Sequence, residues 1–123
     1  GIEIDACLSV MSLRYTGVFC VSLETDSCIR ILAPSYFKDI EESNILFSAS
    51  IKRYVYELVK PGYHRQLLNF LDYAMLKKQL HEGNVPTVTY ERLDGVFVTL
   101  KIYPIAEQNE SIDSVWIFEK KDI

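Results

Sequence analysis

Apolar and polar residues alternate through the C-terminal third of the chain, as they do in half-buried β-strands. Near its middle, Val98 and Leu100 would share one face of a strand and Phe97 the other. Asp94-Gly95 interrupts the alternation, and such a pair between apolar runs signals a hairpin because Gly adopts positive φ without steric cost. The expected strands span residues 85–93, 96–105 and 113–118.

These strands carry large apolar side chains on both faces. In the last strand, Val115 and Ile117 would lie on one face, and Trp116 and Phe118 on the other. An antiparallel sheet with one face in water shows polar residues on that face. We therefore expect helices on one face of the sheet and another element on its second face.

The first half of the chain predicts a second hairpin. A strand over residues 15–23 would place Phe19 and Val21 on one face, with Val18 on the other. A polar turn and a returning strand over residues 28–33 follow.

A helical crossover then links the two strand regions. Ser35 can cap a short helical turn, and an amphipathic helix begins near Ser48 or Ser50. Pro61 ends this helix, since the residue before a proline is disfavoured in the α conformation. A second helical region runs from about residue 64 to 80, and its apolar stripe shifts near Asp72-Tyr73, which predicts a break there.

The opening segment, residues 4–13, also has helical periodicity. Its apolar surface is wider than one packing face, because Ala6, Val10 and Leu13 extend it. We expect these three residues to contact a second copy of the chain in a homodimer. The alternative is that the helix lies deeper within its own fold.

The order of elements predicts an α+β fold: a five-stranded antiparallel sheet with short helices on one face and the N-terminal helix on the other. At 123 residues, the chain is expected to be a single domain. Its parts would be an N-terminal helix (1–14), a hairpin (15–33), a helical crossover (34–84) and a three-strand meander (85–119).

Composition narrows the classes of partner. The net charge of −4 and the scattered acidic residues do not fit the basic surface that nucleic acids require. No apolar run approaches the roughly 18 residues of a membrane span. The chain begins at Gly1, which suggests a fragment of a longer protein or a tag remnant, and a cytoplasmic module is expected. The cysteines Cys7, Cys20 and Cys28 are odd in number and widely spaced, so neither a disulfide framework nor a zinc site is expected.

Several short runs stand in order over nearly the whole chain. They are Leu13-Arg14-Tyr15 into residues 18–23, Leu23-Glu24-Thr25-Asp26, Val59-Lys60-Pro61, Tyr90 to Arg92 with Asp94-Gly95, and Lys121-Asp122-Ile123. Taken together, these runs resemble a PAS domain with a PAS-like five-stranded sheet. More narrowly, the chain resembles the PAS-like sensory modules found ahead of diguanylate cyclase (GGDEF) domains in bacterial signalling proteins. Three positions depart from that pattern: Tyr63 replaces an acidic residue, Glu91 separates Tyr from Arg, and Val98 stands near an expected Trp.

The resemblance implies a non-catalytic sensory or signal-relay module. Such a module senses by binding a small molecule or by rearranging a dimer, and passes the change to a C-terminal output domain such as a diguanylate cyclase. The alternative is a pure protein–protein interaction or dimerisation module with a filled core and no ligand.

A ligand pocket would lie between the sheet and the crossover helices. Tyrosines are the best indication of one, because a buried hydroxyl requires a hydrogen-bond partner. The alternative is that the same side chains pack against one another without a void. The residues expected to face this space are Tyr54, Leu58, Phe70, Tyr90, Val98 and Ile117.

Converging catalytic groups are not evident, so an enzyme is not expected. His64 and His81 are the only imidazoles, and each lies near a helix end, where solvation or capping is the expected role. The reactive-cysteine motif of flavin-binding PAS domains is missing, haem is not expected and no metal site is predicted. A hydratase- or isomerase-like cone, the remaining enzymatic alternative, needs a Tyr/Asp or His/Asp pair inside it.

Overall fold

The computed structural model describes residues 2–33, 46–109 and 112–121, and among them five strands form one antiparallel sheet. The strands are β1 (Tyr15–Ser22), β2 (Ser27–Leu32), β3 (Thr87–Glu91), β4 (Phe97–Asn109) and β5 (Ile112–Lys120). Their order across the sheet is β2-β1-β5-β4-β3. The last strand therefore lies at the centre, where it pairs with both β1 and β4 and joins the two hairpins. The expected α+β class with five antiparallel strands is confirmed.

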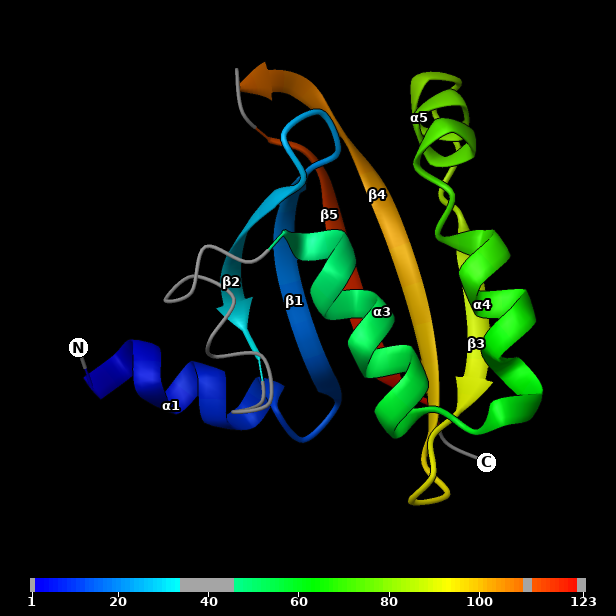
Figure 1. The fold of residues 1–123 in the computed structure, drawn as a ribbon. Helices are drawn as coiled ribbons and strands as arrows, with labels where there is room; N and C mark the ends of the chain where they lie inside the picture. The colour runs from blue at the N-terminus through cyan, green and yellow to red at the C-terminus, as the bar shows by residue number, and fades with distance from the viewer. Residues whose placement is uncertain (1, 34–45, 110–111, 122–123) are drawn as a thin grey trace.

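Helices from the crossover cover one face of this sheet (Figure 1). The crossover helices in the described residues are α3 (Phe47–Leu58), the 3₁₀ turn η2 (Pro61–Tyr63), α4 (His64–Phe70) and α5 (Tyr73–His81). The helix α1 (Ile2–Met11) precedes β1. In Figure 1, α3 lies over the centre of the sheet, and α4 and α5 lie over its β3 side. Both chain segments that form the helical layer therefore come from the middle of the sequence.

The core lies between α3 and the sheet. Phe47, at the start of α3, packs edge-on against Trp116 of β5, with ring centroids 5.0 Å apart. The Phe19 ring of β1 lies 5.5 Å from the same phenyl ring. All three side chains are fully buried, and burying an aromatic side chain contributes about 1.5–3 kcal/mol.

Local sequence explains the breaks between the helices. The Asp72 carboxylate accepts a hydrogen bond from the Ala74 amide at 3.0 Å, so Asp72 is the N-cap that starts α5 as a separate helix. Gly83 follows that helix with φ of 80°, which suits glycine. The break expected near Asp72-Tyr73 is confirmed, as is the Asp94-Gly95 turn, where Gly95 has φ of 85°.

The N-terminal helix differs from expectation in length and in position. It ends at Met11, and Leu13 lies in a turn whose amide donates to the Val10 carbonyl at 3.1 Å. Figure 1 shows α1 extending past the β2 edge of the sheet, so it does not cover the second face. The Arg14 carbonyl accepts a hydrogen bond from the Lys120 amide at 2.8 Å, which joins the chain just before the start of β1 to the end of β5.

Some expectations lie outside the described residues, namely the helical turn beginning at Ser35 and the Asp122-Ile123 end. Across the described part of the chain, none of the helices has both the length and the apolar character needed to cross a bilayer.

Candidate functional site

Two tyrosine hydroxyls meet inside the core, between α3 and β3. The oxygens of Tyr54 and Tyr90 lie 2.6 Å apart, and one donates to the other. Their rings stand nearly perpendicular, with centroids 6.2 Å apart. Tyr90 is fully buried and Tyr54 almost so, which makes this the polar centre of an apolar region. The structure buries both tyrosines, and their role as the lining of a ligand pocket stays a prediction.

The electrostatics keep this tyrosine pair neutral. Burial raises the pKa of Tyr90 well above its usual value, and its contact with Tyr54 raises that pKa further. Arg92 opposes the shift, but its guanidinium is bonded to Asp94, which raises the pKa of Arg92 and lowers that of Asp94. The Tyr90 hydroxyl therefore stays protonated near neutral pH, where it can donate or accept a hydrogen bond.

Three of the other expected pocket residues belong to the same core as this pair. Val98 lies opposite Tyr90 in the sheet register and is fully buried. Leu58 and Phe70 are half-buried and pack against the same cluster. The structure thus brings five of the six expected side chains to one side of the sheet.

The placement of Ile117 was wrong. The burial of β5 alternates, with Trp116 and Phe118 turned toward the helices, so Ile117 between them points to the opposite face. There it lies opposite Val18 of β1 and Lys101 of β4.

Each of the two histidines lies at one end of a helix. A ring nitrogen of His64 lies 2.7 Å from the Val59 carbonyl oxygen, and its ring packs edge-on against Tyr56. His81 ends α5 and is exposed. Within the described residues, no group of His, Cys, Asp and Glu side chains has the geometry to hold a metal ion.

Sequence reasoning missed a polar network at the β1–β2 turn. Asp26 has φ of 55°, and its carboxylate accepts hydrogen bonds from the Ser48 amide at 2.9 Å and from the Ser48 hydroxyl. The same carboxylate accepts from the Tyr73 hydroxyl at 2.6 Å. Asp26 therefore joins the hairpin turn to the starts of α3 and α5. The only sequence signal was an Asp in a turn, a residue type that tolerates positive φ.

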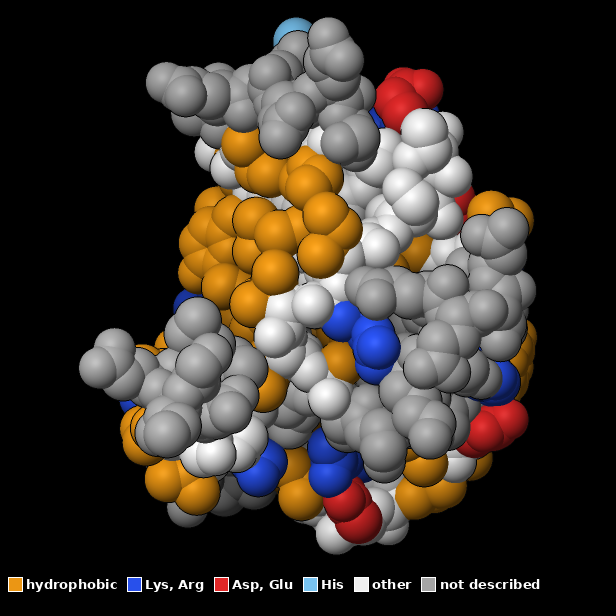
Figure 2. Space-filling view, turned by 90° about the vertical axis from the view of Figure 1, so that its left-hand side faces the viewer, with side chains coloured by type: hydrophobic (Ala, Val, Ile, Leu, Met, Phe, Trp, Pro, Cys, Tyr) orange, Lys and Arg blue, Asp and Glu red, His pale blue; other side chains and the backbone are white. Residues whose placement is uncertain are grey.

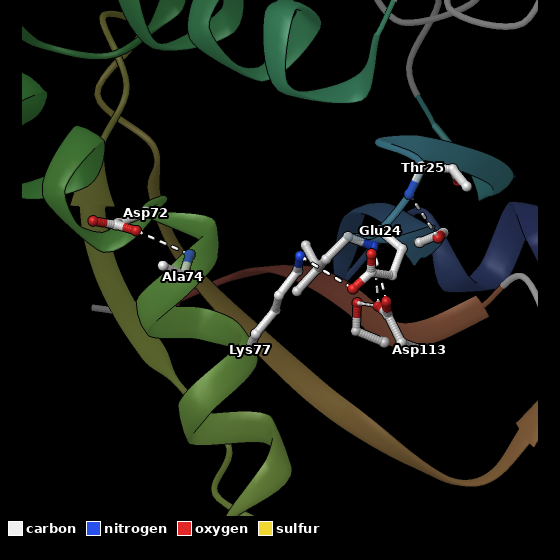
Figure 3. A network of polar contacts seen from close by, with 9 residues as sticks. Glu24, Thr25, Asp72, Ala74, Lys77 and Asp113 are labelled. Atoms are coloured by element: carbon white, nitrogen blue, oxygen red, sulfur yellow. Dashed lines mark hydrogen bonds and ion pairs between the residues drawn. The ribbon is translucent and has the colours of Figure 1, made fainter.

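The same turn is held from the other side by β5 and α5 (Figure 3). Asp113 of β5 accepts a hydrogen bond from the Leu23 amide at 2.9 Å. Lys77 of α5 forms an ion pair with Glu24 at 3.3 Å, and Figure 3 shows this side chain reaching across from the helix. A hydroxyl of Ser114 bridges onward, since it accepts from the Trp116 indole at 3.1 Å.

The second sheet face is apolar and only partly covered. Cross-strand neighbours Ile29, Cys20, Val115 and Tyr103 form a row across β2, β1, β5 and β4. Ile29 is 52% exposed, and the other three are half-buried. Figure 2, seen from the β2 side, shows hydrophobic side chains gathered in one broad area. This area has the character of an interaction surface.

No protein-family model, curated protein or solved structure matches this chain. The fold, the buried tyrosine pair and the apolar second face are therefore the features of this molecule that bear on its function.

Proposed function

We propose that this chain is a PAS-like sensory or signal-relay module of a larger, cytoplasmic bacterial signalling protein. It would have no catalytic activity of its own and would act on a C-terminal output domain such as a diguanylate cyclase. The five-stranded antiparallel sheet, with helices of the crossover on one face, is compatible with that class.

The observation that carries the proposal is the buried Tyr54–Tyr90 hydroxyl pair. A phenol oxygen can accept a further hydrogen bond, so a small ligand with a donor would bind here by parting the two hydroxyls, which lie 2.6 Å apart. Val98 and the half-buried Leu58 and Phe70 supply apolar surroundings for such a ligand. A small, neutral, partly polar molecule fits this chemistry best.

Signalling would follow from a two-state equilibrium. A ligand shifts such an equilibrium only by its differential affinity for the two states. The tyrosines lie on α3 and β3, so a ligand that separates their hydroxyls would move the helical layer relative to the sheet. The segment after β5 would carry this change onward.

A homodimer fits the remaining surface. Ala6, Val10 and Leu13 are all exposed, and Val10 and Leu13 are 67% and 77% exposed. A second copy that covers these residues and the apolar sheet face would remove a large hydrophobic area from water.

Native mass spectrometry of the purified domain tests the ligand. The expected result is a bound small molecule, or a metabolite from a screen that raises the melting temperature. The Tyr54→Phe/Tyr90→Phe double variant, which keeps both rings, should lose that response. Failure to find any ligand for the wild-type protein would favour the second candidate, an interaction module whose core is filled. The mutual hydrogen bond of the tyrosines is the observation that supports that candidate.

A further inference from the structure

The segment from Pro61 to Gly83, with α4 and α5, is built like a flap. It begins just after a fixed point, where Val59 forms an isolated bridge with Arg92 and the Lys60 amide donates to the Glu91 carbonyl at 3.0 Å. It ends at Gly83, whose φ is 80°. A chain segment with a turn at each end can rotate as a unit.

Both apolar and polar contacts hold this flap. Leu67 of α4 and Leu76 and Leu80 of α5 are buried in the core, whereas Met75 is 51% exposed. Tyr73 stands at the junction of α4 and α5, away from both ends of the flap, and its hydroxyl donates to Asp26 at 2.6 Å. The contact therefore lies near the middle of the segment, about equally far along the chain from its two ends.

We propose that Tyr73 and Asp26 form a latch that holds this flap closed over the β3–β4 side of the core. Opening the latch leaves the sheet and α3 in place and lets α4 and α5 move outward together. The Lys77–Glu24 ion pair adds a weaker, more exposed contact between the same helix and the same turn.

The latch is anchored on the sheet itself. The β1–β2 turn that carries Asp26 is bound to β5 through Asp113 and the Leu23 amide. Asp26 also caps α3 through Ser48, so the acceptor stays in position when the tyrosine leaves. A hydrogen bond to a charged acceptor is among the stronger single contacts in a protein, and it is directional. These features make the contact a switchable fastening.

The use of the latch rests on the proposed function. α4 packs against α3 and β3, the two elements that carry the tyrosine pair, so an open flap would give a small ligand access to that pair. A closed flap would then retain the ligand. The existence of the latch does not depend on any ligand.

Hydrogen exchange of backbone amides, compared between wild-type protein and Tyr73→Phe, tests the latch. The phenylalanine keeps the ring and removes only the donor, so α4 and α5 should exchange about tenfold faster. Amides of β1 and β5 should keep their wild-type rates. The matched control is Tyr56→Phe, which removes the hydroxyl of an exposed tyrosine on α3 and should change neither set.

Asp26→Asn supplies an independent arm, because asparagine also tolerates positive φ. It should accelerate exchange in α4 and α5 and also at the first turn of α3. Unchanged exchange in α5 for both variants would overturn the latch, as would an equal loss of protection in every element. Selective acceleration with no ligand found in the wild-type protein would leave the latch standing and count against the sensory proposal.

Discussion

At the scale of single residues, buried hydroxyls decide what the interior can do. The hydroxyls of Tyr54 and Tyr90 form a hydrogen bond with each other, with their oxygens 2.6 Å apart. This bond helps both side chains to be buried, because a buried hydroxyl requires a hydrogen-bond partner. A lone hydroxyl left in that place would lose its partner without regaining water.

This reciprocity predicts a non-additive double-mutant cycle. Tyr54→Phe alone should destabilise the fold by about 1–3 kcal/mol, because the fully buried Tyr90 hydroxyl loses this hydrogen bond, and Tyr90→Phe removes the same bond. The double variant should cost less than the sum of the two, since no orphaned group remains. Urea unfolding of the four proteins measures these values. Strict additivity would show that the two hydroxyls are not coupled.

The Tyr73 contact predicts a change of stability with alkaline pH. Burial and the hydrogen bond to Asp26 raise the pKa of Tyr73, and nearby Cys28 and Asp113 act in the same direction. Above the ordinary value of 10.0, the unfolded chain loses a proton that the folded protein retains. The stability that this tyrosine contributes is therefore complete below about pH 10 and is lost as the pH rises further.

Comparing the wild-type protein with Tyr73→Phe isolates this effect from the titration of lysines. The stability difference between the two proteins should shrink as the pH is raised from about 9 to about 11. Urea midpoints across this range provide the measurement. A difference that stays constant would mean that Tyr73 ionises alike in both states.

A close approach at Gly17 gives a packing prediction. A Cβ added there would lie 2.9 Å from the Phe19 ring and 3.3 Å from the Phe118 ring. Gly17→Ala should therefore destabilise the fold by about 1–3 kcal/mol, because the rings must shift in a packed core. Gly62→Ala is the control, since a Cβ at Gly62 meets nothing within 4 Å. Similar thermal stabilities for the two variants would contradict this account.

At the scale of elements, the periodicity of apolar residues was enough to predict the helices and strands that pack one face against the core. The period-2 pattern placed Val98 and Leu100 on one face of β4, and both are buried, while the break at Asp72 followed from a shift in the helical stripe. Ile117 was misplaced because β5 is apolar on both faces, and hydrophobicity alone cannot tell which face meets the helices. The Asp26 contacts join residues 22 and 47 positions apart, so no local pattern contained them.

The N-terminal helix shows the limit of pattern reasoning most clearly. An amphipathic helix has one face to bury, but α1 is apolar around most of its surface, so its sequence does not specify a direction. The predicted position of α1 was therefore wrong, whereas the prediction that this segment is helical is confirmed.

The exposure of α1 predicts its part in assembly. Val10→Asp should shift a dimer toward monomer, because it places a charge in a surface that would be dry in the dimer. The circular dichroism spectrum should stay unchanged, since the side chain is 67% exposed in the single chain. Light scattering measures the oligomer, and Ser9→Asp at the neighbouring exposed position is the control. An oligomer that withstands Val10→Asp would remove α1 from the interface.

At the scale of the whole molecule, the sheet separates two chemistries. Its helix-covered face holds the neutral tyrosine pair, and its second face carries the half-exposed apolar row through Cys20 and Val115. Because alternate residues of one strand serve the two faces, β5 has both a buried Trp116 and a half-exposed Ile117. A shift of this strand would therefore change the packing on both faces of the sheet at once.

This arrangement predicts that ligand response and assembly can be removed one at a time. Ile117→Asp should weaken self-association and keep the ligand-induced rise in melting temperature, because the charge lies on the face away from the tyrosines. Tyr90→Phe should do the reverse, since it alters the interior and leaves the second face unchanged. Sedimentation velocity and thermal shift on both variants provide the two readouts. Loss of both properties in each variant would contradict the proposal that one face of the sheet serves ligand binding and the other serves self-association.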